Sequence, residues 1–349
     1  MTDETAPAVP MLAPGSQTGS QTGSQPGSQT GIQTGRQDAR SLAASLAPVI
    51  QEACDNRLDD VRWFKADWQR GGAATAIARY RHDHERFAPV VIKLPVGQRE
   101  LTWCRRLQID SGDDGVVGRL YASGDVLGGY DLAWIVIERF PVGPLGHHLA
   151  DDTIPRICDA AARFHAAAAR FPVDQGPRHE DWPALVADAA ESIKVNPVEH
   201  QQQWSKALKA LRARLDDLVA AWRARDTSQW LHGDLHLANA MCRAEGAQAR
   251  VSLIDLAEVH AGHWVEDAIY LERQLWAIPE RLKAHPPVRT LARARRELGL
   301  TADDDYQRLA MIRRALLAGT APKFIRSEGH PRYLEACLAR LETALAELK

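Results

Sequence analysis

Hydrophobic and polar positions alternate with a period of two along the first third of the chain, which predicts a sheet. Three stretches with this alternation are expected to be strands, at 61–69, 74–83 and 88–95. Two further strands are expected at 118–125 and 132–140. The last of the five is almost wholly apolar, which indicates a central position in the sheet.

The spacing of apolar residues changes to that of amphipathic helices in the rest of the chain. One helix is expected inside the sheet region, at 98–108, and the remaining helical segments follow Pro141, at 151–171, about 181–194, 199–225 and 266–349. Asp152 or Thr153 is expected to cap the first of these later helices. The segment 230–259 interrupts the helical pattern, and it predicts a loop and two short strands joined by a Glu-Gly turn.

The N-terminal segment has a different character from the rest of the chain. Residues 11–37 form a short Gly-Ser-Gln-Thr repeat with very few apolar side chains, and such a segment buries too little surface to fold. We therefore expect a disordered tail over 1–38, a sheet-rich lobe over 39–140 that opens with a helix, and a helical lobe over 141–349.

Composition and charge narrow the class of protein. The 349 residues carry a net charge of −2, which gives no sign of a nucleic-acid or membrane-surface partner. The chain has no run of 18 apolar residues and no visible signal peptide. Its five cysteines are widely spaced and odd in number, which is typical of reduced thiols in a cytoplasmic protein.

The stretch "LHGDLHLANAM" concentrates the candidate chemistry. Asp234 and Asn239 are five residues apart, and Asp255 follows an apolar strand 16 residues after Asn239. A hairpin between them would bring Asn239 and Asp255 together, and their two oxygen ligands suit a hard cation such as Mg²⁺. Asp234 would then be free to accept the proton of an attacking hydroxyl. This is the set of groups that phosphoryl transfer requires.

The pattern H-G-D-L-H-x-x-N followed by I-D resembles the aminoglycoside phosphotransferase and choline kinase family, small-molecule kinases with a protein-kinase-like fold. The resemblance covers roughly residues 55–340. It implies an α+β, two-lobed fold. The small antiparallel-sheet lobe, 39–140, would bear one helix and bind the nucleotide, and the larger helical lobe, 141–349, would bear the catalytic hairpin and bind the substrate. It implies transfer of a phosphoryl group from ATP, or from GTP, to a hydroxyl group, with Mg²⁺ as the metal.

The resemblance also implies roles for individual residues. Asp234 would be the catalytic base, and Asn239 and Asp255 the metal ligands. Lys93 would hold the nucleotide phosphates, and Glu100 would pair with it. Further similar segments include the strand that leads into the nucleotide hinge, with Glu138 and Phe140, a helix with Phe164 where the family has leucine before His165, and Gly262 followed by Asp267 at the start of a helix.

The chain departs from the kinase pattern where a glycine-rich loop covers the phosphates. The segment "QRGGAATA" is not G-x-G-x-x-G. Backbone N–H groups cradle anions without a fixed motif, so Gly71, Gly72 and the Thr75 hydroxyl are the candidates for this role.

Several alternatives remain open from the residues alone. His232, Asp234 and His236 could form a direct metal site of a hydrolase, with His260 and His263 as further ligands. A kinase-like scaffold that binds a nucleotide or partner and catalyses little is another alternative. Single residues also have structural interpretations: Lys93 could protect a sheet edge, Glu100 could lie on a solvated helix face, and Glu138 could be structural at the hinge.

The resemblance implies that the acceptor is a small molecule with a hydroxyl group, and the chain does not indicate which one. His236, Glu258 and Glu266 are the candidate substrate residues, and such carboxylates suit a cationic aminoglycoside-, choline- or amino-alcohol-like acceptor. Arginine-rich segments near the C-terminal end would instead suit an anionic acceptor or a solvated helix face. A sugar-like acceptor also remains open, and nothing in the sequence indicates the oligomeric state.

Overall fold

The structure is a computed structural model that describes residues 45–64, 74–82, 86–110, 115–147, 149–246 and 248–348. The expected tail over 1–38, together with Gly71 and Gly72, lies outside these residues. Internal contacts divide the chain into two units. The sheet unit contains the described residues up to His147 together with Ala238–Val259, and the helical unit contains the described residues of His148–Leu237 and His260–Lys349.

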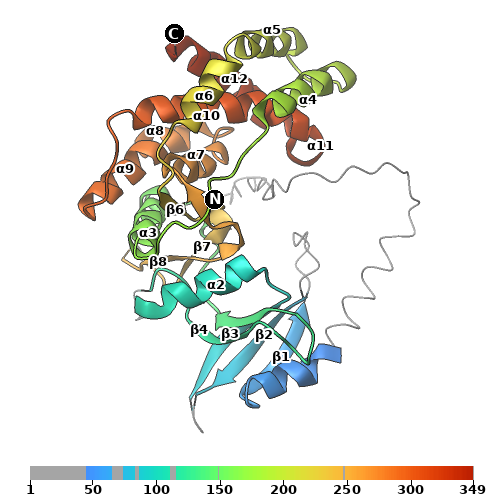
Figure 1. The fold of residues 1–349 in the computed structure, drawn as a ribbon, viewed down its shortest axis with the longest axis vertical. Coiled ribbons are helices and arrows are strands. Elements are labelled where there is room, and N and C mark those ends of the chain that lie inside the picture. Colours follow the sequence, from blue (N-terminus) through green and yellow to red (C-terminus); the bar gives the residue numbers. More distant parts are fainter. Residues whose placement is uncertain are drawn as a thin grey trace, which may run out of the picture. The chain divides into compact units, whose positions relative to one another are not determined.

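The sheet unit is built on an antiparallel five-stranded sheet with strand order β1-β2-β3-β5-β4 (Figure 1). Its strands are β1 (Leu58–Phe64), β2 (Ala74–Arg81), β3 (Phe87–Leu94), β4 (Leu120–Gly124) and β5 (Trp134–Glu138). The sequence predicted all five strands, and the apolar strand β5 is internal, as expected from its sequence. The expected fold class is therefore confirmed.

One face of the sheet forms the core of this unit. Val90, Ile92 and Leu94 alternate along β3 and are fully buried. The helical segment 45–53 adds Leu46 and Ile50 to the same cluster. The alternation has a direct physical cause, since successive side chains of a strand point to opposite faces of the sheet.

Helix α2 (Gln98–Arg106) follows β3 and continues into the 3₁₀ turn η1 (Leu107–Asp110). It buries Leu101, Trp103 and Cys104, and Glu100 lies in its first turn. The amphipathic spacing of 98–108 predicted this helix, and its position places Glu100 near the end of β3.

The predicted hairpin is present as β7 (Ala240–Cys242) and β8 (Val251–Leu253). Its contacts place it in the sheet unit, since Leu253 N donates to Val116 O at 2.8 Å and Cys242 N donates to Val142 O at 2.8 Å. The 3₁₀ turn η4 (Leu256–Glu258) follows β8 and packs against α2. The hairpin was expected in the helical lobe, but these contacts make it part of the sheet unit, which also contains Lys93 and Glu100.

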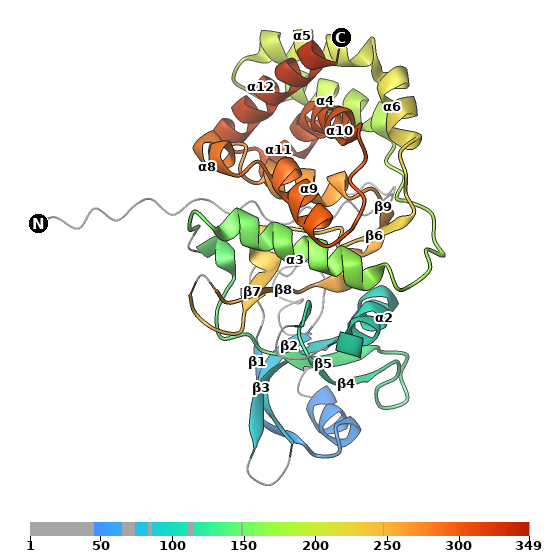
Figure 2. The same cartoon turned by 90° about the vertical axis from the view of Figure 1, so that its left-hand side faces the viewer.

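The helical unit also contains a short antiparallel pair, β6 (Gln229–Leu231) and β9 (His260–Gly262), which the sequence pattern did not indicate. Its helices are α3 (Thr153–Ala168), α4 (Trp182–Val195), α5 (Gln201–Arg212), α6 (Leu215–Arg223), α7 (Val265–Arg273), α8 (Pro279–Ala284), α9 (Pro287–Glu297), α10 (Tyr306–Thr320), α11 (Ile325–Glu328) and α12 (Pro331–Glu347). Helix α3 packs against α9, and α10 packs against α12 (Figure 2). The single helix expected over 199–225 is two helices, α5 and α6.

Five fully buried tryptophans fill the helical unit, Trp182, Trp204, Trp222, Trp264 and Trp276. Each fills a large volume between helices, and aromatic side chains contribute much of the buried apolar surface of such a core. The unit thus has a hydrophobic interior of its own.

All five cysteines of the chain are buried free thiols. Burial raises the pKa of the thiols of Cys54, Cys104 and Cys337 to about 12. No helix in the described part of the chain is long and apolar enough to cross a membrane.

Candidate active site

Asn239 and Asp255 lie at the open end of the β7–β8 hairpin. Asn239 immediately precedes β7, and its carbonyl oxygen accepts a hydrogen bond from Ile254 N at 3.0 Å. Asp255 follows Ile254 with a φ of 64°, in the left-handed region, and begins the turn η4. The hairpin thus brings these two oxygen-bearing residues together, although 16 positions separate them in the sequence.

Lys93 lies between two carboxylates of the sheet unit. Its Nζ is 2.5 Å from Glu100 Oε1 and 3.7 Å from Asp255 Oδ1. Burial disfavours the ammonium charge, but the two carboxylates outweigh it and raise the pKa of Lys93. Because β3 is an internal strand, the edge-protection interpretation of Lys93 is wrong.

The two carboxylates differ in exposure, which separates their roles. The Glu100 side chain is 6% exposed, whereas that of Asp255 is 41% exposed. The solvated-helix interpretation of Glu100 is therefore wrong, because this carboxylate is buried against Lys93. Asp255 keeps an accessible carboxylate beside the lysine and is open to a further ligand.

The other candidate nucleotide-binding residues that the structure describes are Thr75, Glu138 and Phe140. Thr75 is buried on β2 directly opposite Lys93 in the strand register. Glu138 accepts two hydrogen bonds from the Arg243 guanidinium, at 2.9 and 2.7 Å, and one from Arg119 N at 3.0 Å. The same guanidinium stacks 5.1 Å above the centre of the Phe140 ring. The Glu138 side chain therefore stabilises the sheet unit, in agreement with its structural interpretation.

Asp234 belongs to the helical unit, where His236 contacts its carboxylate. His236 Nε2 is 3.3 Å from Asp234 Oδ2, and Tyr270 of α7 also acts on the pKa of this carboxylate. Burial alone would raise the pKa of Asp234, but His236 and Tyr270 outweigh burial and lower it to about 2. The carboxylate is therefore ionised at neutral pH.

Asp267 holds the backbone of the loop that carries Asp234. Its two oxygens accept hydrogen bonds from His232 N and Gly233 N, both at 2.9 Å. Gly233 has a φ of 79°, which a residue with a side chain adopts only with strain. Gly233 and Asp267 thus determine the backbone conformation of the same turn.

His165 and Arg295 support Asp267 from two other helices. His165 Nε2 is 2.9 Å from Asp267 Oδ2, and Arg295 Nη1 is 3.0 Å from His165 Nδ1. An arginine only donates, so His165 Nδ1 accepts and the proton of the neutral ring lies on Nε2. His165 therefore donates to Asp267, and helices α3, α7 and α9 are joined at this point.

The candidate substrate residues have separate environments. Glu266 is buried, and its Oε1 accepts hydrogen bonds from Arg225 Nε and His263 N, both at 2.9 Å. These hydrogen bonds hold the Glu266 carboxylate in the interior of the helical unit. His236 is buried beside Asp234, and Glu258 is partly buried in the turn η4 of the sheet unit.

Three arginines of the predicted C-terminal basic segments have internal partners. Arg314 binds both oxygens of Glu272 at 2.7 Å, and Arg313 binds Glu180 at 2.6 Å. Arg295 is buried against His165. These side chains stabilise the packing of the helical unit, which removes them from the set that could recognise an anionic acceptor.

The sequence analysis did not identify Tyr270 or Gln274. Both lie beside the Asp234 loop, and Gln274 Oε1 accepts a hydrogen bond from Leu237 N at 3.1 Å. Their spacing from Asp267 was the available signal, because residues three and seven positions along a helix share one face.

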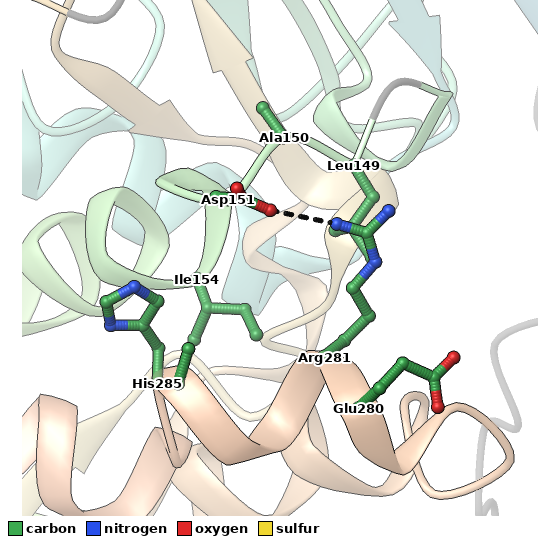
Figure 3. Close-up of a pocket in the computed structure, with 8 residues that line it drawn as sticks. Leu149, Ala150, Asp151, Ile154, Glu280, Arg281 and His285 are labelled. Carbon is green, nitrogen blue, oxygen red and sulfur yellow. Dashed lines mark hydrogen bonds and ion pairs between the residues drawn. The ribbon is translucent and has the colours of Figure 1, made fainter.

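The histidine-based metal site of the hydrolase alternative has no counterpart in the described part of the chain. Those residues contain no group of three or more His, Cys, Asp or Glu side chains that could hold a metal ion. The helical unit has a surface pocket between the start of α3 and helix α8, where Arg281 Nη1 donates to Asp151 Oδ1 at 3.1 Å (Figure 3). None of the predicted site residues lines this pocket.

Comparison with solved structures identifies chains with this fold. An aminoglycoside phosphotransferase from Alicyclobacillus acidocaldarius aligns over 86% of this chain and 94% of its own, with a TM-score of 0.58 and 16% identity. A microcompartment-associated aminopropanol kinase aligns over 86% and 95%, with a TM-score of 0.54 and 14% identity. A thermostable mutant of the aminoglycoside phosphotransferase APH(4)-Ia, in a ternary complex with ADP and hygromycin B, aligns over 88% and 97%, with a TM-score of 0.50 and 13% identity.

Sequence comparison gives the family. A search of curated proteins found no match. The profile of the phosphotransferase enzyme family matches residues 78–312, which is more than half of the chain and includes every candidate residue from Lys93 to Glu266. The chain therefore belongs to the phosphotransferase enzyme family, and it has the kinase-like fold that the sequence pattern predicted.

Proposed function

We propose that this phosphotransferase moves the γ-phosphoryl group of ATP to a hydroxyl group of a small molecule, with Mg²⁺ as the metal. The observation that carries the proposal is the Asp234 carboxylate, which His236 contacts and which stays ionised at neutral pH. An ionised carboxylate can accept a hydrogen bond from an alcohol and orient its oxygen for attack. ATP is preferred to GTP because a chain with this fold was crystallised with ADP.

Each residue has one task in this mechanism. A carboxylate with a pKa of about 2 is a weak base, so Asp234 mainly orients the hydroxyl and takes its proton as the phosphoryl group transfers. Lys93, held charged by Glu100, would bind phosphate oxygens. Enzymes of this kind act chiefly by positioning and by stabilising charge, and these side chains supply both effects.

Asn239 and Asp255 would hold the metal. The amide and carboxylate oxygens that they offer are the hard ligands that Mg²⁺ prefers, and the Asp255 side chain is accessible. When bound, Mg²⁺ neutralises part of the phosphate charge. Lys93 lies 3.7 Å from Asp255, so the same carboxylate lies next to both positive charges that the nucleotide requires.

We propose an aminoglycoside-, choline-, amino-alcohol- or sugar-like acceptor. Two chains with this fold support this range, since one is an aminopropanol kinase and one binds hygromycin B. The buried free cysteines fit a reducing compartment such as the cytoplasm.

The test is acceptor-dependent formation of ADP. The protein is incubated with Mg-ATP and a panel of aminoglycosides, choline, ethanolamine, aminopropanol, homoserine and simple sugars. Asp234→Asn runs in parallel, and we expect it to lower transfer by ~10²–10⁴-fold while Mg-ATP still binds.

Three outcomes separate the alternatives. ADP formation that requires one acceptor and disappears in the variant supports the proposal and identifies the acceptor class. Saturable Mg-ATP binding without turnover on any acceptor would favour the scaffold alternative. Full transfer by Asp234→Asn would refute the role of Asp234.

A further inference from the structure

Helix α7 binds the loop backbone on both sides of Asp234. Before Asp234, the Asp267 carboxylate accepts hydrogen bonds from the two N–H groups of residues 232–233, both at 2.9 Å. After Asp234, Gln274 Oε1 accepts a hydrogen bond from Leu237 N at 3.1 Å. Asp267 lies in the first turn of α7 and Gln274 directly follows its last residue, so one short helix holds the loop at two places.

The Gln274 amide contacts the loop through both its oxygen and its nitrogen. Its Oε1 accepts from Leu237 N, and its Nε2 donates to Leu235 O at 3.4 Å, so it binds the two residues that flank His236. Nε2 also donates to Tyr270 O at 3.1 Å, one turn earlier in α7. These partners fix the orientation of the amide, because the reverse orientation would place its NH₂ group against the N–H of Leu237 and its oxygen against two carbonyl oxygens.

The N–H group that Gln274 binds opens the 3₁₀ turn η3 (Leu237–Asn239). The first N–H groups of a helical turn have no partner within the turn, so they need one from outside it. Leu235 and Leu237 are buried, and the Gln274 side chain supplies this partner in the interior of the helical unit. It thereby fixes the point where the chain enters η3, three residues after Asp234.

We infer that Gln274 is a positioning residue for phosphoryl transfer, which fixes the backbone that follows Asp234 and thereby the place of the Asp234 carboxylate. The inference rests on the proposed function of Asp234. Asp267 holds the backbone only before Asp234, so the position of the carboxylate depends on a second contact after it. Small displacements matter in such a site, since a shift of about 1 Å in a positioning group costs up to ~10²-fold in rate.

The first test is Gln274→Leu, which keeps the approximate volume of the side chain and removes the whole amide. We expect kcat to fall about 10-fold, because the backbone after Asp234 loses its side-chain partner. The Kd for Mg-ATP should stay unchanged. The proposed nucleotide and metal residues lie in the sheet unit, and Asn239 O has its own hydrogen bond from Ile254 N.

The matched control is Gln201→Leu in the same unit. Gln201 Nε2 donates to Ile193 O at 2.8 Å, so this variant also removes a hydrogen bond from a glutamine amide to the backbone of another segment, away from the Asp234 loop. The melting temperatures of both variants measure the loss of stability that such a change causes. Gln201→Leu should keep the wild-type kcat, and an equal fall of kcat in this control would overturn the inference.

A double-mutant cycle tests whether Gln274 acts through Asp234. In the Asp234→Ala background, Gln274→Leu should leave the residual rate unchanged, since no carboxylate remains to be positioned. An equal fall of kcat in both backgrounds would contradict the inference, and so would an unchanged kcat in the single variant. Weaker binding of Mg-ATP that accounts for the lost rate would also contradict it.

The same experiments separate failure of this inference from failure of the proposed function. If Asp234→Asn keeps full transfer, the proposed role of Asp234 fails, and the role of Gln274 fails with it. If Asp234→Asn loses transfer and Gln274→Leu does not, only the role of Gln274 fails.

Discussion

At the scale of single residues, Lys93 has two carboxylate neighbours that differ in distance and in exposure. Glu100 is buried and contacts the ammonium group directly, whereas Asp255 is accessible and lies farther away. A buried ion pair contributes little net stability, but removal of one partner leaves an uncompensated charge in the interior. If Lys93 binds the nucleotide as proposed, stability and nucleotide binding should depend on this residue through different partners.

Substitution of Lys93 should separate these two effects. Lys93→Met keeps most of the apolar stem and leaves Glu100 buried without its cation, which should lower the free energy of unfolding by about 3–5 kcal/mol. The double variant Lys93→Met/Glu100→Gln should recover most of that stability and remain unable to bind Mg-ATP tightly. Urea denaturation and ATP titration of both variants provide the measurements.

Two results would contradict this account. Equal stability of the single and double variants would show that Glu100 does not depend on Lys93. Tight binding of Mg-ATP by either variant would remove Lys93 from the nucleotide site.

At the scale of elements, the contact of α3, α7 and α9 joins three helices through His165. Burial lowers the pKa of His165, and the positive charge of Arg295 acts in the same direction against the opposing effect of Asp267. The ring is therefore neutral in the folded protein, as its hydrogen bond from Arg295 requires.

This neutral ring predicts a loss of stability in mild acid. A histidine whose folded pKa lies below its ordinary value of about 6.5 binds more protons when unfolded. Its contribution is fully present above about pH 6.5 and is lost as the pH falls below that value, by at most about 1.4 kcal/mol per pH unit. Melting temperatures of wild type and His165→Gln, measured between about pH 7 and pH 5, should show a shallower decline in the variant.

Other titrating groups also change the melting temperature with pH. The pKa of His263 is also lowered by burial, so part of the decline should persist in His165→Gln. The lowered pKa values of Asp267 and Glu266 act in a different window, below about pH 4, where these carboxylates take up protons. Identical slopes for the two proteins would exclude His165 as the source.

The elements also show what the sequence could and could not predict. Strands such as β3 were predictable because their alternation reflects burial of one face. The kinase-like motif predicted the roles of Asp234, Asn239 and Asp255, and these roles remain predictions. Strands β6 and β9 pair with each other across 29 to 33 positions, so no local turn marks them, unlike the hairpin of β7 and β8. The break between α5 and α6 carries no glycine or proline near Ala213 to mark it.

Two candidate site residues have long-range partners that the sequence could not reveal. Glu266 looked like a substrate carboxylate because its partner Arg225 is 41 positions away in the sequence. Glu138 looked like part of the nucleotide hinge, yet Arg243 binds it from 105 positions away. Local patterns contain no information about such pairs.

At the scale of the whole molecule, the candidate residues divide between the two units. Lys93, Glu100, Asn239 and Asp255 belong to the sheet unit, and Asp234 belongs to the helical unit, with the boundary at Leu237–Ala238. The proposed nucleotide residues are thus all in one unit and the proposed base is in the other. Nucleotide binding and phosphoryl transfer should therefore be separable by substitution.

Thermal stabilisation by Mg-ATP tests this separation. A ligand at 100 times its Kd stabilises the folded state by about 2.7 kcal/mol. We expect Mg-ATP to raise the melting temperature of wild type and Asp234→Asn equally, and to have little effect on Asp255→Ala. ATP without Mg²⁺ is the control, and full protection of Asp255→Ala by Mg-ATP would argue against its role as a metal ligand.

The burial of all five cysteines has a practical consequence for such studies. Maleimide dyes react with thiolates, and buried thiols whose pKa is raised to about 12, such as those of Cys54, Cys104 and Cys337, form almost none at neutral pH. A cysteine introduced at Tyr130 in the sheet unit or at Val195 in the helical unit would lie at a site that is 67% or 69% exposed. The folded chain can therefore take a fluorophore at a chosen position in either unit with its native cysteines left in place.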